Sequence, residues 1–314
     1  MQVASGSEVS ILQIAAAKQH EKWIASFGEK RQIKRQCDLY ALMYVEASRE
    51  NTIKKVEDQW KSISWDLLRR GIMSLCSVPE AYLTIRSHFA RTLASFSIGS
   101  YLIGIGDRHL ENFLLSFKDG GLVGIDFGHA FGSATQFLPI PELVPFRLTR
   151  QFTNFLLPLD SEGLLFHNMR HTLRALRNHK DVLLSTMDVF VTEPLIDWEK
   201  LARRLAHEQR SGHDEDGDSA SAWFVKEKIA VAKMKLEGHH PSHIIVRELS
   251  SSVHASRPFI PSLSNIVLGD PKYDTRASLP SQGLSVDDQV EALVDLSSDP
   301  AVLGRMYGGW APWI

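Results

Sequence analysis

Three oxygen-bearing side chains near the middle of the chain form the most informative pattern in the sequence. Asp107 precedes Asn112 by five positions, and Asp126 follows Asn112 by fourteen. Phosphoryl transfer leaves a protein little covalent work, so its site needs one carboxylate to orient and deprotonate a hydroxyl and two oxygen ligands for Mg²⁺. We predict that Asp107 is the catalytic base and that Asn112 and Asp126 hold the metal.

Two further residues lie on the same short loop. His109 follows Asp107 by two positions, so its imidazole can face the transferred phosphate or the substrate hydroxyl and act as an electrophile or a proton relay. Arg108 is predicted to have a structural role.

The elements on either side of this loop must position these residues. A long helix is expected from Ser77-Val-Pro-Glu80, which has the form of a capping box, to about Phe96, with an apolar stripe at helical spacing. Two short apolar runs, 113–117 and 122–127, are separated by a glycine-containing turn and predict a β-hairpin.

The rest of the chain reads mainly as helices. They are expected at 53–63, from Pro145 to about 155, and at 163–178, 181–191, 197–209, 222–236 and 285–296, the last capped by Ser285 with Asp288. The acidic, glycine-containing stretch 211–221 predicts a mobile linker, and 254–281 is rich in proline with little pattern.

Composition excludes several classes of protein. The 314 residues include 35 Lys and Arg against 37 Asp and Glu, so a surface built mainly to hold nucleic-acid phosphates is not expected. Two cysteines are too few for a disulfide framework, and the apolar runs are too short to span a membrane. A soluble intracellular protein is expected.

Gly106-Asp-Arg-His-Leu-Glu-Asn112, followed by Ile125-Asp-Phe-Gly-His-Ala-Phe-Gly132, resembles the phosphatidylinositol 3-kinase-related protein kinases. The likeness covers nearly the whole chain, and Trp310-Ala-Pro-Trp313 resembles the FATC element that closes these kinases. The resemblance implies an α+β, mainly helical fold: a kinase-like C-lobe of the atypical PI3/PI4-kinase type with a small catalytic β-hairpin and a C-terminal helical FATC element.

Domain limits follow from the same resemblance. The kinase C-lobe is expected at 1–253, a linker at 254–282 and the FATC domain at 283–314. Within the lobe we call 104–112 the catalytic loop and 126–145 the activation loop. The activation loop contains the predicted site residues Phe127, Gly128, Thr135 and Gln136.

The family resemblance also implies an activity. It is phosphorylation of protein Ser or Thr, preferably before Gln, with ATP and Mg²⁺ as cofactors bound at Asn112 and Asp126. The implied setting is the nucleus, in repair of DNA double-strand breaks by non-homologous end joining. The implied partners are the Ku heterodimer and DNA ends, reached through regions outside this chain, and no membrane.

Other expected kinase parts are not found. No G-x-G-x-x-G precedes Asp107, and neither a strand lysine nor its helix glutamate is recognisable. The chain is therefore expected to begin near the hinge, without an N-lobe, and to have little activity alone. A catalytically inactive fragment that serves as an interaction module is the alternative.

The composition of the activation loop bears on the substrate. A phosphoinositide headgroup calls for Lys and Arg, and residues 129–145 contain neither. An apolar loop favours a protein substrate over a lipid, although a phosphoinositide kinase remains the weaker alternative. The aromatic residues Tyr307, Trp310 and Trp313 are expected to dock on the kinase lobe rather than on a membrane.

Overall fold

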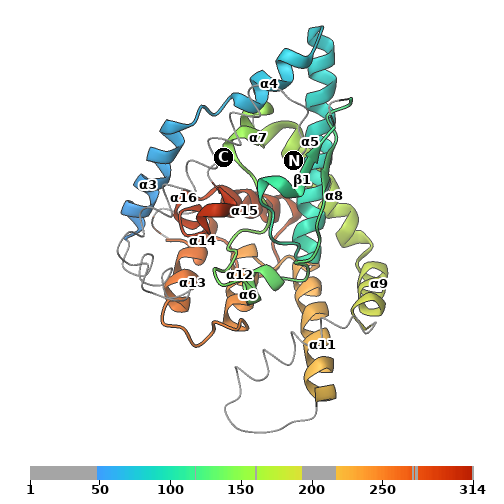
Figure 1. Cartoon of the computed structure of the whole chain (residues 1–314). Coiled ribbons are helices and arrows are strands. Elements are labelled where there is room, and N and C mark those ends of the chain that lie inside the picture. The colour runs from blue at the N-terminus through green and yellow to red at the C-terminus, as the bar shows by residue number, and fades with distance from the viewer. Residues whose placement is uncertain are drawn as a thin grey trace.

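The computed structural model describes residues 48–116, 118–159, 161–192, 217–270, 272 and 275–312. Helices dominate this part of the chain, and its one sheet is a two-stranded hairpin (Figure 1). The prediction of a mainly helical fold with a small β-hairpin is confirmed. The elements are α3 (Arg49–Ser62), α4 (Leu67–Leu75), α5 (Pro79–Ile103), η2 (Leu110–Asn112), β1 (Phe113–Leu115), β2 (Leu122–Gly124), α6 (Ser133–Phe137), α7 (Arg150–Phe155), η3 (Ser161–Leu165), α8 (Phe166–Asn178), α9 (Lys180–Thr192), α11 (Gly217–Leu236), α12 (Pro241–Ser250), α13 (Ile260–Leu268), α14 (Thr275–Ser278), α15 (Val286–Ser298), α16 (Pro300–Leu303) and η4 (Gly308–Trp310).

Helix α5 is the long element that leads into the catalytic loop. It begins at Pro79, where a missing N–H costs nothing, and it ends at Gly104, whose φ of 70° only glycine adopts readily. The predicted capping box is not formed. Val78, not Ser77, is the N-cap residue, and no side chain caps the helix. The proline therefore fixes the start of this helix by its own restricted φ.

The helix expected from Pro145 begins only at Arg150, so that prediction is wrong for residues 145–149. The physical reason is tertiary. Arg147 is 1% exposed, and its guanidinium donates to the carbonyl oxygens of Trp310 and Ala311 at 2.7 Å each. These distant contacts hold 145–149 out of the helical conformation that local spacing favours.

Other boundaries also moved. Helix α11 begins at Gly217, within the stretch expected to be a linker; the rest of that stretch, 211–216, and the expected helix at 197–209 lie outside the described residues. Helices α13 and α14 lie in the segment 254–282, where we expected an irregular linker. The local, proline-rich sequence does not predict these helices. Helix α13 is stabilised by the burial of four apolar side chains, Phe259, Ile260, Leu263 and Val267.

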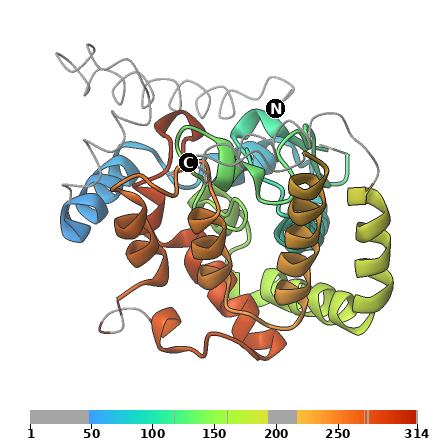
Figure 2. The same ribbon diagram turned by 90° about the horizontal axis from the view of Figure 1, so that it is seen from below.

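The described part of the chain has two large apolar clusters. The first packs α5 against the hairpin, α7, α8 and α15; it includes Phe89, Leu93, Phe113, Phe152, Phe155, Met169 and Leu293. The second joins the activation loop to α12, α13 and residues 300–312, here called the C-terminal segment; it includes Ile140, Leu143, Leu249, Leu263, Met306 and Trp310. Figure 2 shows α13, α12, α11 and α9 as a row of neighbouring helices.

Helix α15 supplies a local stability test. Ser285 is its N-cap, and the Ser285 hydroxyl accepts the Asp288 N–H at 3.1 Å, as the sequence predicted. We expect Ser285→Ala to lower the free energy of unfolding by about 1 kcal/mol, because an orphan N–H of the first turn loses its partner. Urea unfolding measures the loss. The control is Ser250→Ala at the last residue of α12, and equal losses in the two variants would contradict the capping role.

Candidate active site

The loop that carries the predicted site residues is held against the activation loop by backbone contacts. Hydrogen bonds of 2.8–2.9 Å join residues 103–106 to residues 129–132. A Cβ at Gly104 would meet the Gly132 nitrogen at 2.6 Å, so only glycine allows this approach. Backbone hydrogen bonds therefore hold the end of α5 directly against the activation loop.

The hairpin brings the two predicted metal ligands to the same end. In its antiparallel register Phe113 pairs with Gly124, and the Ile125 N–H donates to the Asn112 carbonyl at 3.0 Å. Asn112 therefore lies across from Ile125, one residue before Asp126. Residues fourteen apart in sequence become neighbours because the hairpin folds back between them.

The buried Arg108 side chain links the catalytic loop to the residues that follow β2. It is 1% exposed, and its guanidinium donates to the carbonyl oxygens of Gly106 at 2.9 Å, Ile125 at 2.7 Å and Asp126. Its planar fork joins the catalytic loop to the residues after β2. The predicted structural role of Arg108 is confirmed.

Asp107 lies half-buried at the start of the loop with an unusual backbone. Its φ is 56°, in the left-handed region. Its N–H donates to Oε1 of Glu142 at 2.8 Å, and its carbonyl oxygen accepts from Nδ2 of Asn112 at 2.7 Å. Side chains thus bind both backbone polar groups of Asp107, and none of the hydrogen bonds or ion pairs between the described residues uses its carboxylate.

The donor set of Asn112 and Asp126 fits a hard divalent cation. Because Nδ2 of Asn112 is bound to the Asp107 carbonyl, the oxygen of this buried amide is the atom left for a ligand. Asp126 is exposed, and one of its carboxylate oxygens accepts the Gly128 N–H at 3.1 Å. An amide oxygen and a carboxylate are ligands that Mg²⁺ prefers. Clusters of three or more His, Cys, Asp or Glu suited to a metal are absent from the described residues.

His109 caps the short helix η2. Its Nδ1 accepts the Glu111 N–H at 3.3 Å. In a neutral imidazole with Nδ1 as acceptor, Nε2 carries the proton and is the donor. The half-exposed ring can therefore offer an N–H to an oxygen at the site.

The predicted activation-loop residues separate into two groups. Phe127 and Gly128 are exposed, and the Phe127 side chain is 51% accessible. Thr135 and Gln136 are buried in α6: the Thr135 hydroxyl donates to the Glu142 carbonyl at 2.8 Å, and Gln136 accepts from Nζ of Lys228. The second pair therefore anchors the activation loop, and Thr135 also lines the small cavity beside Gly104, Ile105 and Gly106.

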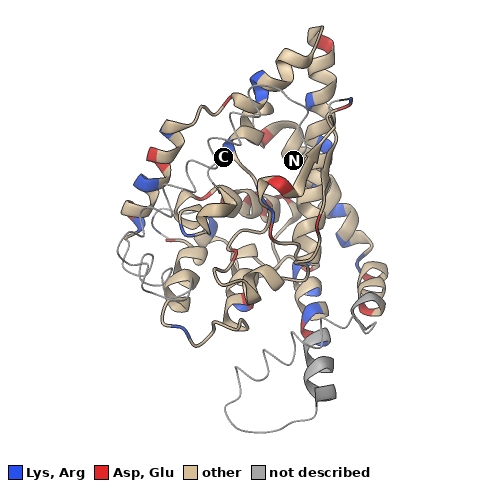
Figure 3. Ribbon diagram, in the orientation of Figure 1, with Lys and Arg blue, Asp and Glu red and all other residues tan. Residues whose placement is uncertain are grey.

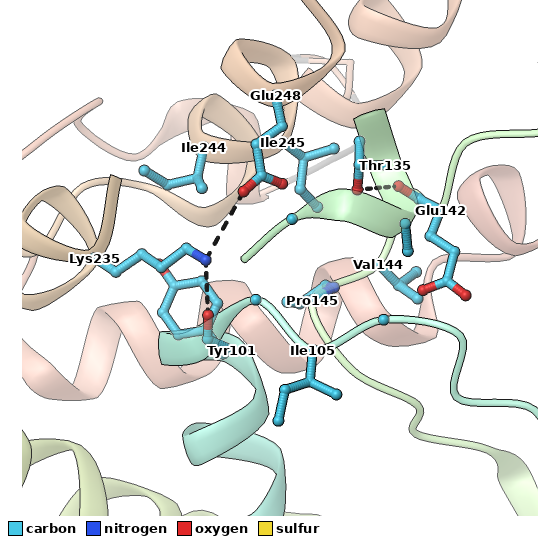
Figure 4. A pocket seen from close by; sticks show the side chains of 14 residues that line it. Tyr101, Ile105, Thr135, Glu142, Val144, Pro145, Lys235, Ile244, Ile245 and Glu248 are labelled. Carbon is cyan, nitrogen blue, oxygen red and sulfur yellow. Dashed lines mark hydrogen bonds and ion pairs between the residues drawn. The ribbon is translucent and has the colours of Figure 1, made fainter. Parts of the chain in front are cut away.

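A buried basic and acidic network lies behind the catalytic loop. Nζ of Lys235 donates to the Tyr101 carbonyl at 2.8 Å and lies 4.0 Å from Oε1 of Glu248 (Figure 4). Burial lowers the pKa of Lys235, and it lowers the pKa of Lys228 to about 8. The network joins α5 to α11 and α12 around a cavity of about 30 Å³, room for about one water molecule.

Glu142 and Arg147 are two further buried ionisable residues beside the site. Burial, with the negative charge of Asp107, raises the pKa of Glu142 to about 8. Burial lowers the pKa of Arg147 to about 9, although the charge of Glu142 opposes this shift. In Figure 4 the Glu142 carboxylate lies on the opposite side of the cavity from Lys235 and Glu248.

A second, larger cavity of about 200 Å³ adjoins Asp107. Its walls come from the activation loop and the C-terminal segment, and they are mostly apolar; besides Asp107 they comprise Leu138, Pro139, Ile140, Pro141, Glu142, Met306, Tyr307 and Trp310. The predicted docking of the C-terminal aromatics on the lobe is confirmed for Trp310, which is 4% exposed and stacks on Arg147 at 4.5 Å. Trp313 lies outside the described residues.

Sequence reasoning missed Glu142 and Arg147. A signal was present: Glu142 is the one Asp, Glu, Lys or Arg among residues 129–145, in an otherwise apolar, proline-rich run. A lone charge in such a run is expected to be buried with a specific partner. The partner of Glu142, a backbone N–H 35 residues earlier, could not be read from the sequence.

Charges elsewhere on the described chain are mixed. Figure 3 shows Lys and Arg interspersed with Asp and Glu over the helices. None of the helices described is both long and apolar enough to pass through a lipid bilayer.

Comparison with known proteins places these features in a family. Residues 8–200 match the phosphatidylinositol 3- and 4-kinase family, and residues 283–314 match the FATC domain. The DNA-dependent protein kinase catalytic subunit of Dictyostelium discoideum is 54% identical over 97% of this chain, and that of Gallus gallus is 41% identical over 94%. The chain spans 7% of the length of each of these relatives.

A solved structure agrees with this fold. The FAT and kinase domain of CtTel1 superposes with a TM-score of 0.60 at 23% identity, covering 89% of this chain and 16% of that one. With a family match over more than half of its residues, the chain belongs to the phosphatidylinositol 3- and 4-kinase family, in the branch of the phosphatidylinositol 3-kinase-related protein kinases, and carries a FATC domain.

Proposed function

We propose that this chain is the catalytic part of a protein kinase that transfers the γ-phosphate of ATP to protein Ser or Thr. The observation that carries the proposal is the hairpin, which gathers Asp107, Asn112 and Asp126 around one loop. The catalytic lobe is proposed at 1–253, with a connecting segment at 254–282 and the FATC domain at 283–314.

Each site residue has a proposed role. Asp107 orients the substrate hydroxyl and accepts its proton, because its carboxylate is free while its backbone is bound. Asn112 and Asp126 would hold Mg²⁺, which supplies charge neutralisation on the ATP phosphates when it is bound. The Nε2–H of His109 donates to an oxygen that gains negative charge during transfer.

The cavity beside Asp107 supports a substrate residue that follows the phosphorylated Ser or Thr. Its walls between residues 138–142 and Trp310 are mostly apolar, which suits the two methylene groups of a Gln side chain. Residues 129–145 contain no Lys or Arg to hold a phosphoinositide headgroup. We therefore propose a protein substrate with Ser-Gln or Thr-Gln over a lipid.

The cellular setting is also part of the proposal. Both relatives carry the name of the DNA-dependent protein kinase catalytic subunit. We propose that the protein acts in the nucleus in repair of DNA double-strand breaks by non-homologous end joining. Contact with the Ku heterodimer and with DNA ends would use regions outside this chain.

Peptide phosphorylation tests the activity. The longest natural polypeptide that contains this chain is assayed with Ser-Gln and Ser-Ala peptides, ATP and Mg²⁺. We expect faster transfer to the Ser-Gln peptide, and loss of at least about 100-fold in Asp126→Ala, because a metal ligand is removed. The control is Asp119→Ala, an exposed carboxylate in the hairpin turn.

Two results would redirect this proposal. Absence of transfer and of ATP–Mg²⁺ binding in the folded wild-type protein would favour an inactive interaction module. Transfer to phosphatidylinositol with none to either peptide would favour a lipid kinase.

A further inference from the structure

The backbone around Asp107 is held by two buried side chains of a single segment, Glu142 and Arg147. Oε1 of Glu142 accepts the Asp107 N–H at 2.8 Å, and Nη1 of Arg147 donates to the Arg108 carbonyl at 3.3 Å. The two peptide groups that flank the Asp107–Arg108 pair are thus bound from residues 142 and 147. Both residues lie well beyond the catalytic loop in sequence.

These contacts act on a strained residue. The φ of Asp107 is 56°, a left-handed conformation that a non-glycine residue keeps only where its surroundings determine it. A change of φ swings Cβ and redirects the carboxylate. The Glu142 contact fixes the Asp107 N–H and with it the 106–107 peptide plane, and the Asn112 amide holds the Asp107 carbonyl, so the two contacts together resist this rotation.

The space around Glu142 leaves it little freedom. Oε2 of Glu142 lies so close to Gly106 that a Cβ on Gly106 would be 2.9 Å from it. The backbone carbonyl of Glu142 accepts the Thr135 hydroxyl at 2.8 Å. Its side chain is 7% exposed. The acceptor is therefore rigid, as a group that sets the position of another residue must be.

Arg147 extends the arrangement to the C-terminal segment. The same guanidinium that reaches the Arg108 carbonyl also donates to the carbonyl oxygens of Trp310 and Ala311 and lies over the Trp310 ring. The activation loop, the catalytic loop and the C-terminal segment meet at these two side chains.

We infer that Glu142 is a positioning residue, which holds Asp107 in its left-handed conformation by accepting the Asp107 N–H and so aims the catalytic carboxylate. The inference rests on the proposed kinase function for the role of Asp107. The hydrogen bond itself does not depend on that function.

Three variants separate this role from others. Glu142→Gln keeps an acceptor oxygen at the same reach, Glu142→Leu keeps similar volume without an acceptor, and Glu142→Asp keeps the carboxyl group on a shorter arm. In the natural polypeptide with peptide substrates, we expect kcat to fall about 10- to 100-fold in the Leu and Asp variants with KM for ATP unchanged. The Gln variant should stay within about 3-fold of the wild type.

Amide hydrogen exchange supplies a second readout. Protection of the Asp107 N–H should persist in Glu142→Gln and be lost in Glu142→Leu, or in Glu142→Asp if the Leu variant fails to fold. Equal protection in the wild type and in a folded Leu or Asp variant would overturn the inference. If the wild type transfers no phosphate, the proposed function is wrong. Amide exchange still tests whether Glu142 binds the Asp107 N–H.

Substrate dependence excludes a role in recognition. A positioning residue lowers kcat equally for Ser-Gln and Ser-Ala peptides, because both use the same base. Loss confined to the Ser-Gln peptide would assign Glu142 to the substrate pocket that it also lines, and would overturn the positioning role.

Discussion

Replacing Asp107 with Asn is expected to lower kcat by about 100- to 10,000-fold while KM for ATP stays within a few-fold of the wild-type value. Asn has nearly the same shape and keeps the backbone contacts with Glu142 and Asn112, but its amide cannot accept the hydroxyl proton. Steady-state phosphorylation of a Ser-Gln peptide by the natural polypeptide measures both constants. The effect lies in kcat because the base acts in the transition state.

The matched control for Asp107 is on the same loop. Glu111→Gln also removes a carboxylate, but Glu111 is exposed and lies outside the predicted set of site residues. Its kcat should stay close to that of the wild type. Retention of more than about a tenth of wild-type kcat in Asp107→Asn would exclude this residue as the base.

The second large effect concerns stability against pH. Glu142 has a pKa of about 8 in the folded protein, against an ordinary value of 4.5, because burial and the nearby Asp107 charge disfavour its ionised form. Between pH 4.5 and 8 the folded state therefore binds a proton that the unfolded state has lost. Rising pH then favours unfolding by up to about 1.4 kcal/mol per pH unit.

Glu142→Gln should remove that contribution. The stability that protonated Glu142 contributes is fully present below pH 4.5 and is lost as pH rises through 8. Between these pH values the free energy of unfolding of Glu142→Gln should therefore rise relative to that of the wild type. Urea unfolding of the chain at pH 5, 6, 7 and 8 measures the difference. The control is Glu80→Gln on the exposed first turn of α5. Parallel stability curves for the wild type and Glu142→Gln would show that Glu142 titrates normally.

Local sequence was sufficient for several elements because their signals are local. Glycines at 120 and 121 between two apolar runs predicted the hairpin, and Ser285 with Asp288 predicted the cap of α15. Both depend on contacts between residues a few positions apart. A structural role for Arg108 was also predicted, but its burial and its contacts with the Ile125 and Asp126 carbonyls were not.

The errors have a common cause in contacts over long sequence separations. Residues 145–149 read as helix, but Arg147 binds carbonyl oxygens more than 160 residues later. The segment 254–282 read as irregular, yet Phe259 and Leu263 are buried in the apolar cluster around the C-terminal segment. Local propensity cannot register a partner that only the folded chain provides.

The site divides along the same line. The sequence by itself determined which residue types could carry phosphoryl transfer, because the spacing of Asp107, Asn112 and Asp126 spans one loop and one hairpin. Only the tertiary structure decided how Asp107 is held, since the N–H that sets its left-handed backbone is bound by Glu142, 35 residues away. A hydrogen bond between a backbone group and a distant side chain produces no repeating pattern in the sequence. This contact can therefore be identified only from the structure, in which the activation loop packs against the catalytic loop.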